Sequence, residues 1–132
     1  MAKKYDIVIV GGGNAGLGVS AVAAPAGKSI AFVEERDFGG TCPNRGCTPK
    51  KILVAAAHAL HEIEIAGVHG IEVAKPRLDW ARLIDREKAM IADLPVKLGK
   101  VAADRGEIYR GQARCVGAGG EPGGGEGRAG GR

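Results

Sequence analysis

The stretch that decides the fold is Tyr5–Glu35, YDIVIVGGGNAGLGVSAVAAPAGKSIAFVEE, near the start of this 132-residue chain. Its β-branched run Ile7–Val10 is typical of a strand that is buried on both faces of a parallel sheet. Glycines follow at once, and small residues then dominate Ala15–Ala26, which indicates a helix packed closely on the sheet. A second β-branched run, Ser29–Val33, predicts the next strand. This order predicts a βαβ unit and an α/β fold with a parallel sheet.

The glycines of the first turn fit a loop that binds a dinucleotide. Gly11, Gly13 and Gly16 match G-x-G-x-x-G. The first permits a tight turn, the second lets the backbone approach a pyrophosphate, and the third lets the helix pack against the strand. The N-terminus of that helix offers free amide groups and the positive end of its dipole to phosphates. Glu34 follows Gly16 by 18 residues, where an acid binds ribose hydroxyls. The alternative is a glycine-rich loop without a ligand, but the ordered strand, glycines, helix, strand and acid favour the dinucleotide.

Periodicity and helix-breaking residues predict the remaining elements. Pro25 removes a backbone hydrogen bond, so we expect the first helix to stop or kink around Ala24. Two long helices are expected before the third strand, because apolar residues recur there at helical spacing. The predicted elements are a helix from Pro49 through Ile65, an extended piece at Val68–Val73, a helix capped by Asp79 and bent at Pro95, and short strands at Ile108–Arg110 and Ala113–Val116.

The segment GGTCPNRGCTPKK, residues 39–51, holds two of the three cysteines of the chain. In a regular helix, α-carbons five residues apart are roughly 8–9 Å from each other, and a disulfide needs about 7 Å or less. Cys42 and Cys47 therefore cannot be bridged across a regular helix. Pro43 and Pro49 indicate an irregular backbone, and they place the pair at or just before a helix N-terminus. The helix dipole and the nearby Arg45, Lys50 and Lys51 favour the thiolate form.

Three kinds of site compete for this cysteine pair. A zinc site needs four ligands, usually as two close pairs, and the remaining Cys115, His58, His61 and His69 form no second close pair. Two inert buried thiols are a second possibility, but the charged and glycine-rich surroundings disfavour them. A redox-active pair is the interpretation that the sequence favours.

Taken together, the two motifs resemble the N-terminal part of the FAD-dependent pyridine nucleotide-disulfide oxidoreductases, the family of glutathione reductase, dihydrolipoamide dehydrogenase and mercuric reductase. The resemblance covers Tyr5–Val116 and is densest from Tyr5 to Lys51. It implies a Rossmann-like FAD-binding domain at residues 1–116, with two additional helices that carry the dithiol. It also implies an oxidoreductase of cell redox homeostasis, in which electrons pass from NAD(P)H through FAD to a Cys42–Cys47 disulfide and on to a small-molecule disulfide. Full-length members of the family are homodimers and carry a separate nicotinamide domain.

The resemblance also implies roles for individual residues. Cys47 would lie against the flavin as the charge-transfer thiolate, and Cys42 would be the interchange thiol that attacks the substrate. Either Lys50 or Lys51 would approach the flavin, and Cys115 would be a structural thiol in the segment GQARCVG. The residues expected to contact FAD are Gly11, Gly13, Asn14, Ala15, Gly16, Glu34, Glu35, Gly40, Thr41, Cys42, Gly46, Cys47, Lys50, Lys51 and Ala113.

Composition narrows the class of protein further. The net charge is only +4 and aromatic residues make up 4%, without the basic and aromatic cluster of nucleic-acid binders. No apolar run is long enough to span a membrane, no cleavable signal peptide is recognisable, and three cysteines are too few for a secreted disulfide scaffold. We therefore expect a cytoplasmic domain that binds neither nucleic acid nor membrane.

The last segment, residues 117–132, differs in character from the rest. It holds nine of the 23 glycines, so we expect it to be disordered, or to come from a truncated or frameshifted reading of the gene. Because the nicotinamide domain of the family does not fit in 132 residues, the chain alone is expected to be inactive with NAD(P)H. Two alternatives to a working reductase domain stay open: a non-enzymatic FAD-binding fragment, and a flavin-free thiol module that senses redox state.

Overall fold

The structure is a computed structural model that describes residues 3–113. A three-stranded parallel sheet lies at one end of the molecule, in the order β1-β2-β3. Its strands are β1 (Ile7–Val10), β2 (Ile30–Glu34) and β3 (Glu107–Arg110). Ile7 pairs with Ile30, and Ala31 pairs with Glu107. The α/β fold with a parallel sheet is therefore confirmed. The predicted strand residues 114–116, the role of Cys115 and the tail 117–132 lie outside the described residues.

Helix α1 (Asn14–Ala23) connects β1 to β2 and completes the βαβ unit. It ends where Pro25 predicted, because Ala24 is its C-cap residue and the chain turns at Gly27, which has a φ of 71°. The second strand begins one residue later than expected, at Ile30. The sequence signals in the first 35 residues therefore predict the bounds of β1 and β2 to within one residue.

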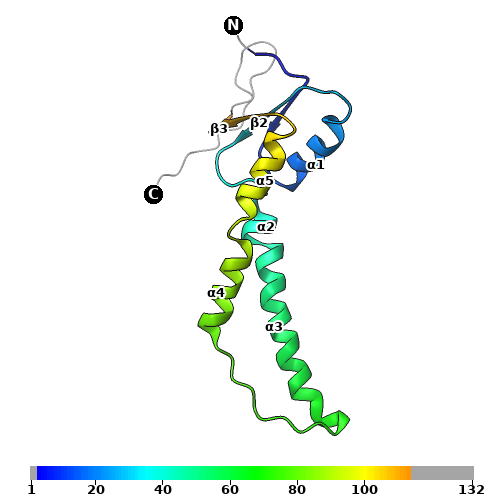
Figure 1. Cartoon of the computed structure of the whole chain (residues 1–132), viewed down its shortest axis with the longest axis vertical. Helices are drawn as coiled ribbons and strands as arrows, with labels where there is room; N and C mark the ends of the chain where they lie inside the picture. Colours follow the sequence, from blue (N-terminus) through cyan, green and yellow to red (C-terminus); the bar gives the residue numbers. More distant parts are fainter. Residues whose placement is uncertain (1–2, 114–132) are drawn as a thin grey trace, which may run out of the picture.

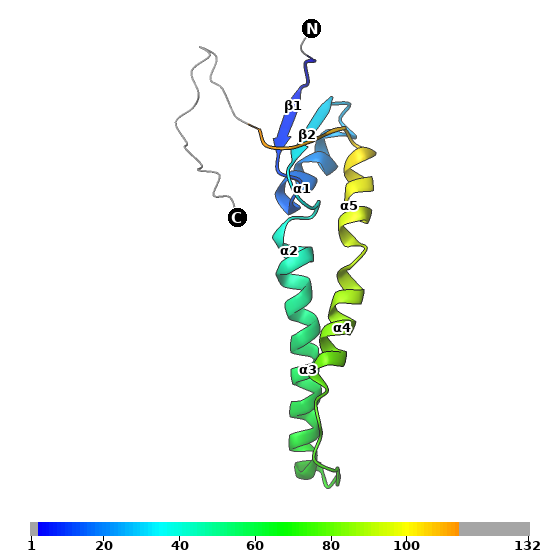
Figure 2. The same ribbon diagram turned by 90° about the vertical axis from the view of Figure 1, so that its left-hand side faces the viewer.

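A long helical arm extends from the sheet (Figures 1 and 2). The chain leaves the sheet through the short helix α2, descends through α3, turns at the 3-10 helix η1, and returns through α4 and α5 to β3. These elements are α2 (Thr41–Arg45), α3 (Cys47–Ile65), η1 (Ala66–His69), α4 (Trp80–Ile91) and α5 (Leu94–Ala103). In the described part of the chain, no helix combines the length and the apolar character needed to cross a bilayer.

The hydrophobic core lies at the sheet end, between the sheet and two helices. Phe32 and Phe38 are completely buried, and their rings meet edge to face with centroids 5.9 Å apart. The rest of the core comes from β1, β2, α1 and α5: Ile9, Leu17, Ala23, Ile30 and Ala102. No residue of α3 or α4 is buried. The sheet end therefore contributes the apolar burial that stabilises the described fold.

Three expectations need correction. The strand Ile7–Val10 is not buried on both faces, because Val8 is 58% and Val10 is 55% exposed. The core helices contact the other face, through Ile9, and no described residue covers these two valines. The piece Val68–Val73 is not extended throughout: it begins inside η1 and passes through Gly70, whose φ of 75° is left-handed. Pro43 does not itself disrupt the backbone, since it lies in the first turn of α2, where a proline removes no helical hydrogen bond.

Two helix predictions are confirmed. The side chain of Asp79 caps α4 by accepting a hydrogen bond from the Arg82 amide at 3.0 Å. The bend expected at Pro95 is a complete break, since α4 ends at Ile91 and α5 begins at Leu94 with Pro95 in its first turn. Both features, the cap and the break, lie on the segment that returns the chain from the arm to the sheet.

Candidate functional site

The glycine-rich turn between β1 and α1 has the geometry that its three glycines predict. Gly11 has a left-handed φ of 100°, and its amide donates to the Val33 carbonyl at 2.8 Å. A Cβ on Gly16 would lie 2.3 Å from the Gly11 oxygen and 2.7 Å from Cγ2 of Ile9. Only a glycine at position 16 lets α1 approach the strand this closely.

The N-terminus of α1 is open to a ligand. Its N-cap is Gly13, which offers no side chain, and the first helical hydrogen bond runs from the Leu17 amide to the Gly13 carbonyl at 2.9 Å. The amides of Asn14, Ala15 and Gly16 precede that bond, so the helix itself provides them no partner. A Cβ on Gly13 would meet no atom closer than 3.9 Å. The space in front of the helix is therefore free for an anionic group.

A second glycine turn faces the first. Gly39 and Gly40 have left-handed φ angles of 96° and 64°, and the Gly39 amide donates to the Gly12 carbonyl at 2.7 Å. A Cβ on Gly40 would approach the Gly13 α-carbon to 3.1 Å. The two turns thus form a narrow cradle that any larger residue at position 40 would begin to fill.

Glu34, the last residue of β2, lies at this cradle, as its distance from Gly16 in the sequence predicted. One carboxylate oxygen accepts from the Gly12 amide at 2.6 Å, and the other accepts from the Arg36 amide at 2.7 Å. The acid is therefore held at the glycine turn by two backbone donors. Glu35 instead points to the Gln112 side chain at 3.2 Å, and Ala113 is exposed beyond it. The structure thus brings Glu34 to the site but leaves Glu35 and Ala113 at its periphery.

Sequence reasoning missed Asn44, which attaches α2 to the second glycine turn. The residue is only 9% exposed, and its amide group donates to the carbonyls of Phe38 and Gly40, both at 3.0 Å. Its side-chain oxygen is buried without a partner among the described residues. A polar residue between the two cysteines was the available signal, because a buried amide must find backbone partners.

The two cysteines meet at a break between helices. Gly46 separates α2 from α3 with φ −135° and ψ −100°, and Cys47 is the first residue of α3. This confirms that the pair lies at a helix N-terminus and not within one regular helix. Both cysteines are free thiols, and the Cys47 side chain hydrogen-bonds to Cys42. Thiols in contact can form a disulfide without unfolding either helix.

The hydrogen bonds of the pair make the two thiols unequal. The bond from Cys47 lowers the pKa of Cys42 below its ordinary value of 9.0, and the Asn14 side chain and the charge of Lys51 act in the same direction. Donating that bond raises the pKa of Cys47. The more acidic thiol is therefore Cys42, the residue expected to attack a disulfide. Because Asn14 is the first residue of α1, its bond to Cys42 also joins the dithiol to the open helix N-terminus.

The structure places the remaining predicted residues around the dithiol. Lys51 follows Cys47 by one helical turn, and its charge acts on both thiols. Thr41 opens α2, and a Cβ on Gly46 would lie 3.1 Å from the Thr41 carbonyl. Lys50 is exposed on α3, where its amide donates to the Gly46 carbonyl at 3.0 Å.

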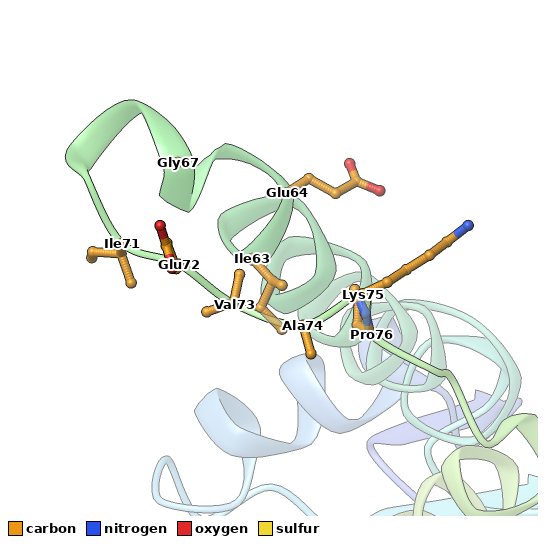
Figure 3. A pocket seen from close by; sticks show the side chains of 9 residues that line it. All are labelled: Ile63, Glu64, Gly67, Ile71, Glu72, Val73, Ala74, Lys75 and Pro76. Carbon is orange, nitrogen blue, oxygen red and sulfur yellow. The ribbon is translucent and has the colours of Figure 1, made fainter.

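Two of the hollows lie along α3. One of about 620 Å³ lies between α3 and α4, and Thr48 and Lys51 at its edge put it beside the dithiol. The other, of about 630 Å³, lies at the far tip of the arm between the end of α3 and residues 71–76 (Figure 3). Ile63 and Val73 line this second hollow, away from the glycine turns. Across residues 3–113, no group of three or more His, Cys, Asp or Glu side chains could hold a metal ion.

These residues fit a bound dinucleotide with a dithiol beside it. The open α1 N-terminus and the Gly13–Gly40 cradle suit a pyrophosphate, and Glu34 offers a carboxylate at the same turn. The Cys42–Cys47 pair lies next to the second glycine turn, since α2 begins directly after Gly40. Fold and site together are those of a nucleotide-binding domain of the Rossmann type with two neighbouring thiols beside its glycine turns.

Comparison with known proteins identifies the family. A family model described as pyridine nucleotide-disulphide oxidoreductase matches residues 5–121, and the chain belongs to this family, whose N-terminal part it matches. Dihydrolipoyl dehydrogenase of Bacillus subtilis is 33% identical over 123 residues, which are 89% of this chain and 25% of that protein. Mercuric reductase of Streptomyces lividans is 37% identical over 112 residues, 83% of this chain and 24% of that enzyme.

A glutathione reductase and a solved structure extend the comparison. Glutathione reductase of Nostoc sp. is 34% identical over 119 residues, 88% of this chain and 26% of that enzyme. The HOCl-induced flavoprotein disulfide reductase RclA from Escherichia coli superposes with a TM-score of 0.63 and 30% identity, over 83% of this chain and 22% of that chain. The chain therefore spans about a quarter of the length of the relatives it matches.

Proposed function

We propose that this chain binds FAD and forms the flavin- and dithiol-bearing part of a disulfide reductase. The observation that carries the proposal is the pair of facing glycine turns: the N-terminus of α1 is open, a Cβ on Gly40 would approach the Gly13 α-carbon to 3.1 Å, and α2 with Cys42 begins directly after Gly40. The similarity to enzymes named as disulfide reductases supports it. When bound, FAD supplies the two-electron chemistry that couples NAD(P)H to a disulfide.

The two facing glycine turns and Glu34 would hold the cofactor. The amides of Asn14 and Ala15 and the cradle of Gly13 and Gly40 would bind the pyrophosphate, because these groups offer backbone donors and space for close approach. Glu34 would exchange its bond to the Gly12 amide for bonds to ribose hydroxyls. The site therefore needs no side-chain cation to bind the phosphates.

The dithiol performs the exchange with the substrate. The Cys42 thiolate attacks a disulfide, forms a mixed disulfide, and releases one substrate thiolate; Cys47 then attacks the Cys42 sulfur and releases the second. The substrate disulfide gains two electrons, and the protein dithiol, which loses them, becomes the Cys42–Cys47 disulfide. Lys51 favours both thiolates, so we assign it, and not Lys50, the supporting charge.

The wider setting of the reaction belongs to the same proposal. Small-molecule disulfides are the substrates, a second copy of the full-length protein is the partner, and the cytoplasm is the compartment, since free thiols persist there. A flavin-free thiol module is the competing interpretation, because the dithiol is complete without a cofactor.

Flavin retention tests the proposal. The chain is refolded with FAD, excess cofactor is removed, and bound flavin is measured by absorbance. We expect wild type to retain FAD and Gly13→Val to retain none, because the valine would occupy the open space in front of α1. Gly18→Val on the same helix is the matched control, since a Cβ at position 18 would meet nothing within 4 Å. A wild-type chain without flavin, or a Gly13→Val chain with a full complement, refutes the proposal.

A further inference from the structure

Asn44 joins the helix of the first cysteine to the second glycine turn. It is the fourth residue of α2, which lies between the sheet and α3 (Figure 1), and it is only 9% exposed. Its amide nitrogen donates two hydrogen bonds of 3.0 Å, to the carbonyls of Phe38 and Gly40. These carbonyls belong to the residues on either side of Gly39. One buried side chain therefore fixes the backbone before and after the glycine that pairs with the first turn.

The orientation of the Asn44 amide follows from its partners. Carbonyl oxygens only accept hydrogen bonds, so the NH2 group must face them, and the side-chain oxygen is buried without a partner among residues 3–113. A leucine of similar shape would leave both carbonyls unpaired, and the carboxylate of an aspartate would repel them. The connection therefore depends on the two donors of a short amide side chain.

The two bonds also set the direction of the backbone amides that follow each carbonyl. In a trans peptide the C=O and the next N–H point in opposite directions, and no peptide bond in the described chain is cis. The Phe38 carbonyl points to Asn44, and the Gly39 amide accordingly points the other way, where it donates to the Gly12 carbonyl at 2.7 Å. The first of the two bonds thus explains how the second glycine turn reaches the first.

The second bond directs the Thr41 amide. Because Asn44 holds the Gly40 carbonyl, the Thr41 N–H points away from the Asn44 side chain. Thr41 is the first residue of α2, so the helix gives its amide no acceptor, and no other group in residues 3–113 accepts from it. Gly40 in turn lies against Gly13, the N-cap of α1. A backbone donor without a partner therefore lies beside the open N-terminus of α1.

We propose that Asn44 is a positioning residue of the cofactor site, which aims the Thr41 amide at the phosphates that bind the N-terminus of α1. This inference deepens the proposed function and rests on it. Asn44 acts through the two carbonyls that it holds and not by contact with the phosphates. Both glycine turns then give backbone donors to the phosphates, and one of these donors depends on a residue between the two cysteines.

Amide protection in the wild-type chain is the first test. The chain is labelled with nitrogen-15 and refolded with or without FAD, and the hydrogen exchange of single amides is followed by NMR. We expect FAD to slow exchange of the Thr41 amide about tenfold or more, because a hydrogen bond to an anion protects the donor. The Gly39 amide, already bonded to Gly12, should change little. If FAD is retained and the Thr41 amide stays unprotected, the inference fails and the proposed function stands; a chain that retains no FAD refutes both.

A substitution then tests Asn44 itself. Asn44→Leu retains the shape and removes both donors, so we expect FAD to bind about tenfold to hundredfold more weakly, the range for one hydrogen bond to a charged group. Protection of the Thr41 amide by FAD should disappear in the same variant. The Gly11 amide, bonded to the Val33 carbonyl at 2.8 Å, reports whether the sheet end is folded. Should the leucine variant not fold, Asn44→Ala makes the same test, because water can then reach the two carbonyls.

The matched control removes the other side-chain connection between α2 and the second turn. Arg45→Gln eliminates the exposed ion pair of 3.0 Å with Asp37 and leaves the two bonds of Asn44 in place. We expect its affinity for FAD to stay within about twofold of wild type, since an exposed ion pair contributes little. Equal losses of affinity in the Arg45 and Asn44 variants, or a folded Asn44 variant that binds FAD like wild type, overturn the assignment.

Discussion

The sheet end and the helical arm of this molecule are stabilised in different ways. At the sheet end, Phe32, Phe38 and Ala102 are completely buried between the sheet and its helices. In the arm, α3 extends from Cys47 to Ile65 without one buried residue, and α4 has none. The hydrophobic effect therefore stabilises the sheet end directly, whereas the arm presents its apolar side chains to a groove and to solvent.

The dithiol lies where these two regions meet. Asn44 ties α2 to the glycine turn of the sheet end, and after the break at Gly46 the long helix α3 begins with Cys47. Cys42 thus lies in the short helix that Asn44 attaches to the sheet end, and Cys47 opens α3. This difference teaches that the glycine turns of the proposed cofactor site depend on the packed end, whereas α3 and α4 can vary in sequence with little effect on the core.

The largest effect on the free energy of unfolding is expected at Gly16, a glycine of the packed end where α1 lies against β1. Gly16→Ala places a Cβ 2.3 Å from the Gly11 oxygen, so α1 must move away from β1. We expect a loss of about 1–3 kcal/mol in the free energy of unfolding, the range for overpacking. Urea unfolding followed by circular dichroism measures it.

The control is a glycine two residues away. Gly18 lies in the same helix, and an added Cβ there meets nothing within 4 Å. Gly18→Ala is expected to stabilise the chain by about 0.5–1 kcal/mol, because alanine restricts the unfolded chain and favours the helix. Equal effects of the two substitutions would show that α1 does not pack on β1 as described.

The sequence predicted the sheet end better than its surroundings. Gly11, Gly16 and Glu34 stand at offsets that the βαβ unit requires, so their contacts follow from spacing alone. The exposure of Val8 could not be predicted, because a β-branched run does not reveal whether a second layer covers it. Asn44 was missed since its partners, the carbonyls of Phe38 and Gly40, are brought together by left-handed glycines and not by a local pattern.

The second prediction concerns the thiols at the junction. Cys47→Ala removes the donor that lowers the pKa of Cys42, so we expect that pKa to rise, while Cys47→Ser retains a hydroxyl donor and keeps it lower. The pH dependence of Cys42 alkylation, read by peptide mapping, gives both values. Because the folded-state pKa of Cys42 is depressed, this contribution to stability is present above its unfolded value of 9.0 and is lost as the pH falls through the folded value. Identical Cys42 profiles in the two variants would contradict the hydrogen bond.

The smallest effect is expected in the arm, and its size is informative. Val54 is 40% exposed on α3, whereas Ile9 is 7% exposed in β1. Ile9→Val removes one methylene from the core and should cost about 0.5–1.5 kcal/mol. Val54→Ala removes twice as many carbon atoms, yet we expect a change within about 0.5 kcal/mol, because little buried area is lost and alanine is the better helix former. Thermal unfolding of the two variants in parallel measures the contrast. A larger loss at Val54 than at Ile9 would mean that the exposed face of α3 is packed against another surface in solution.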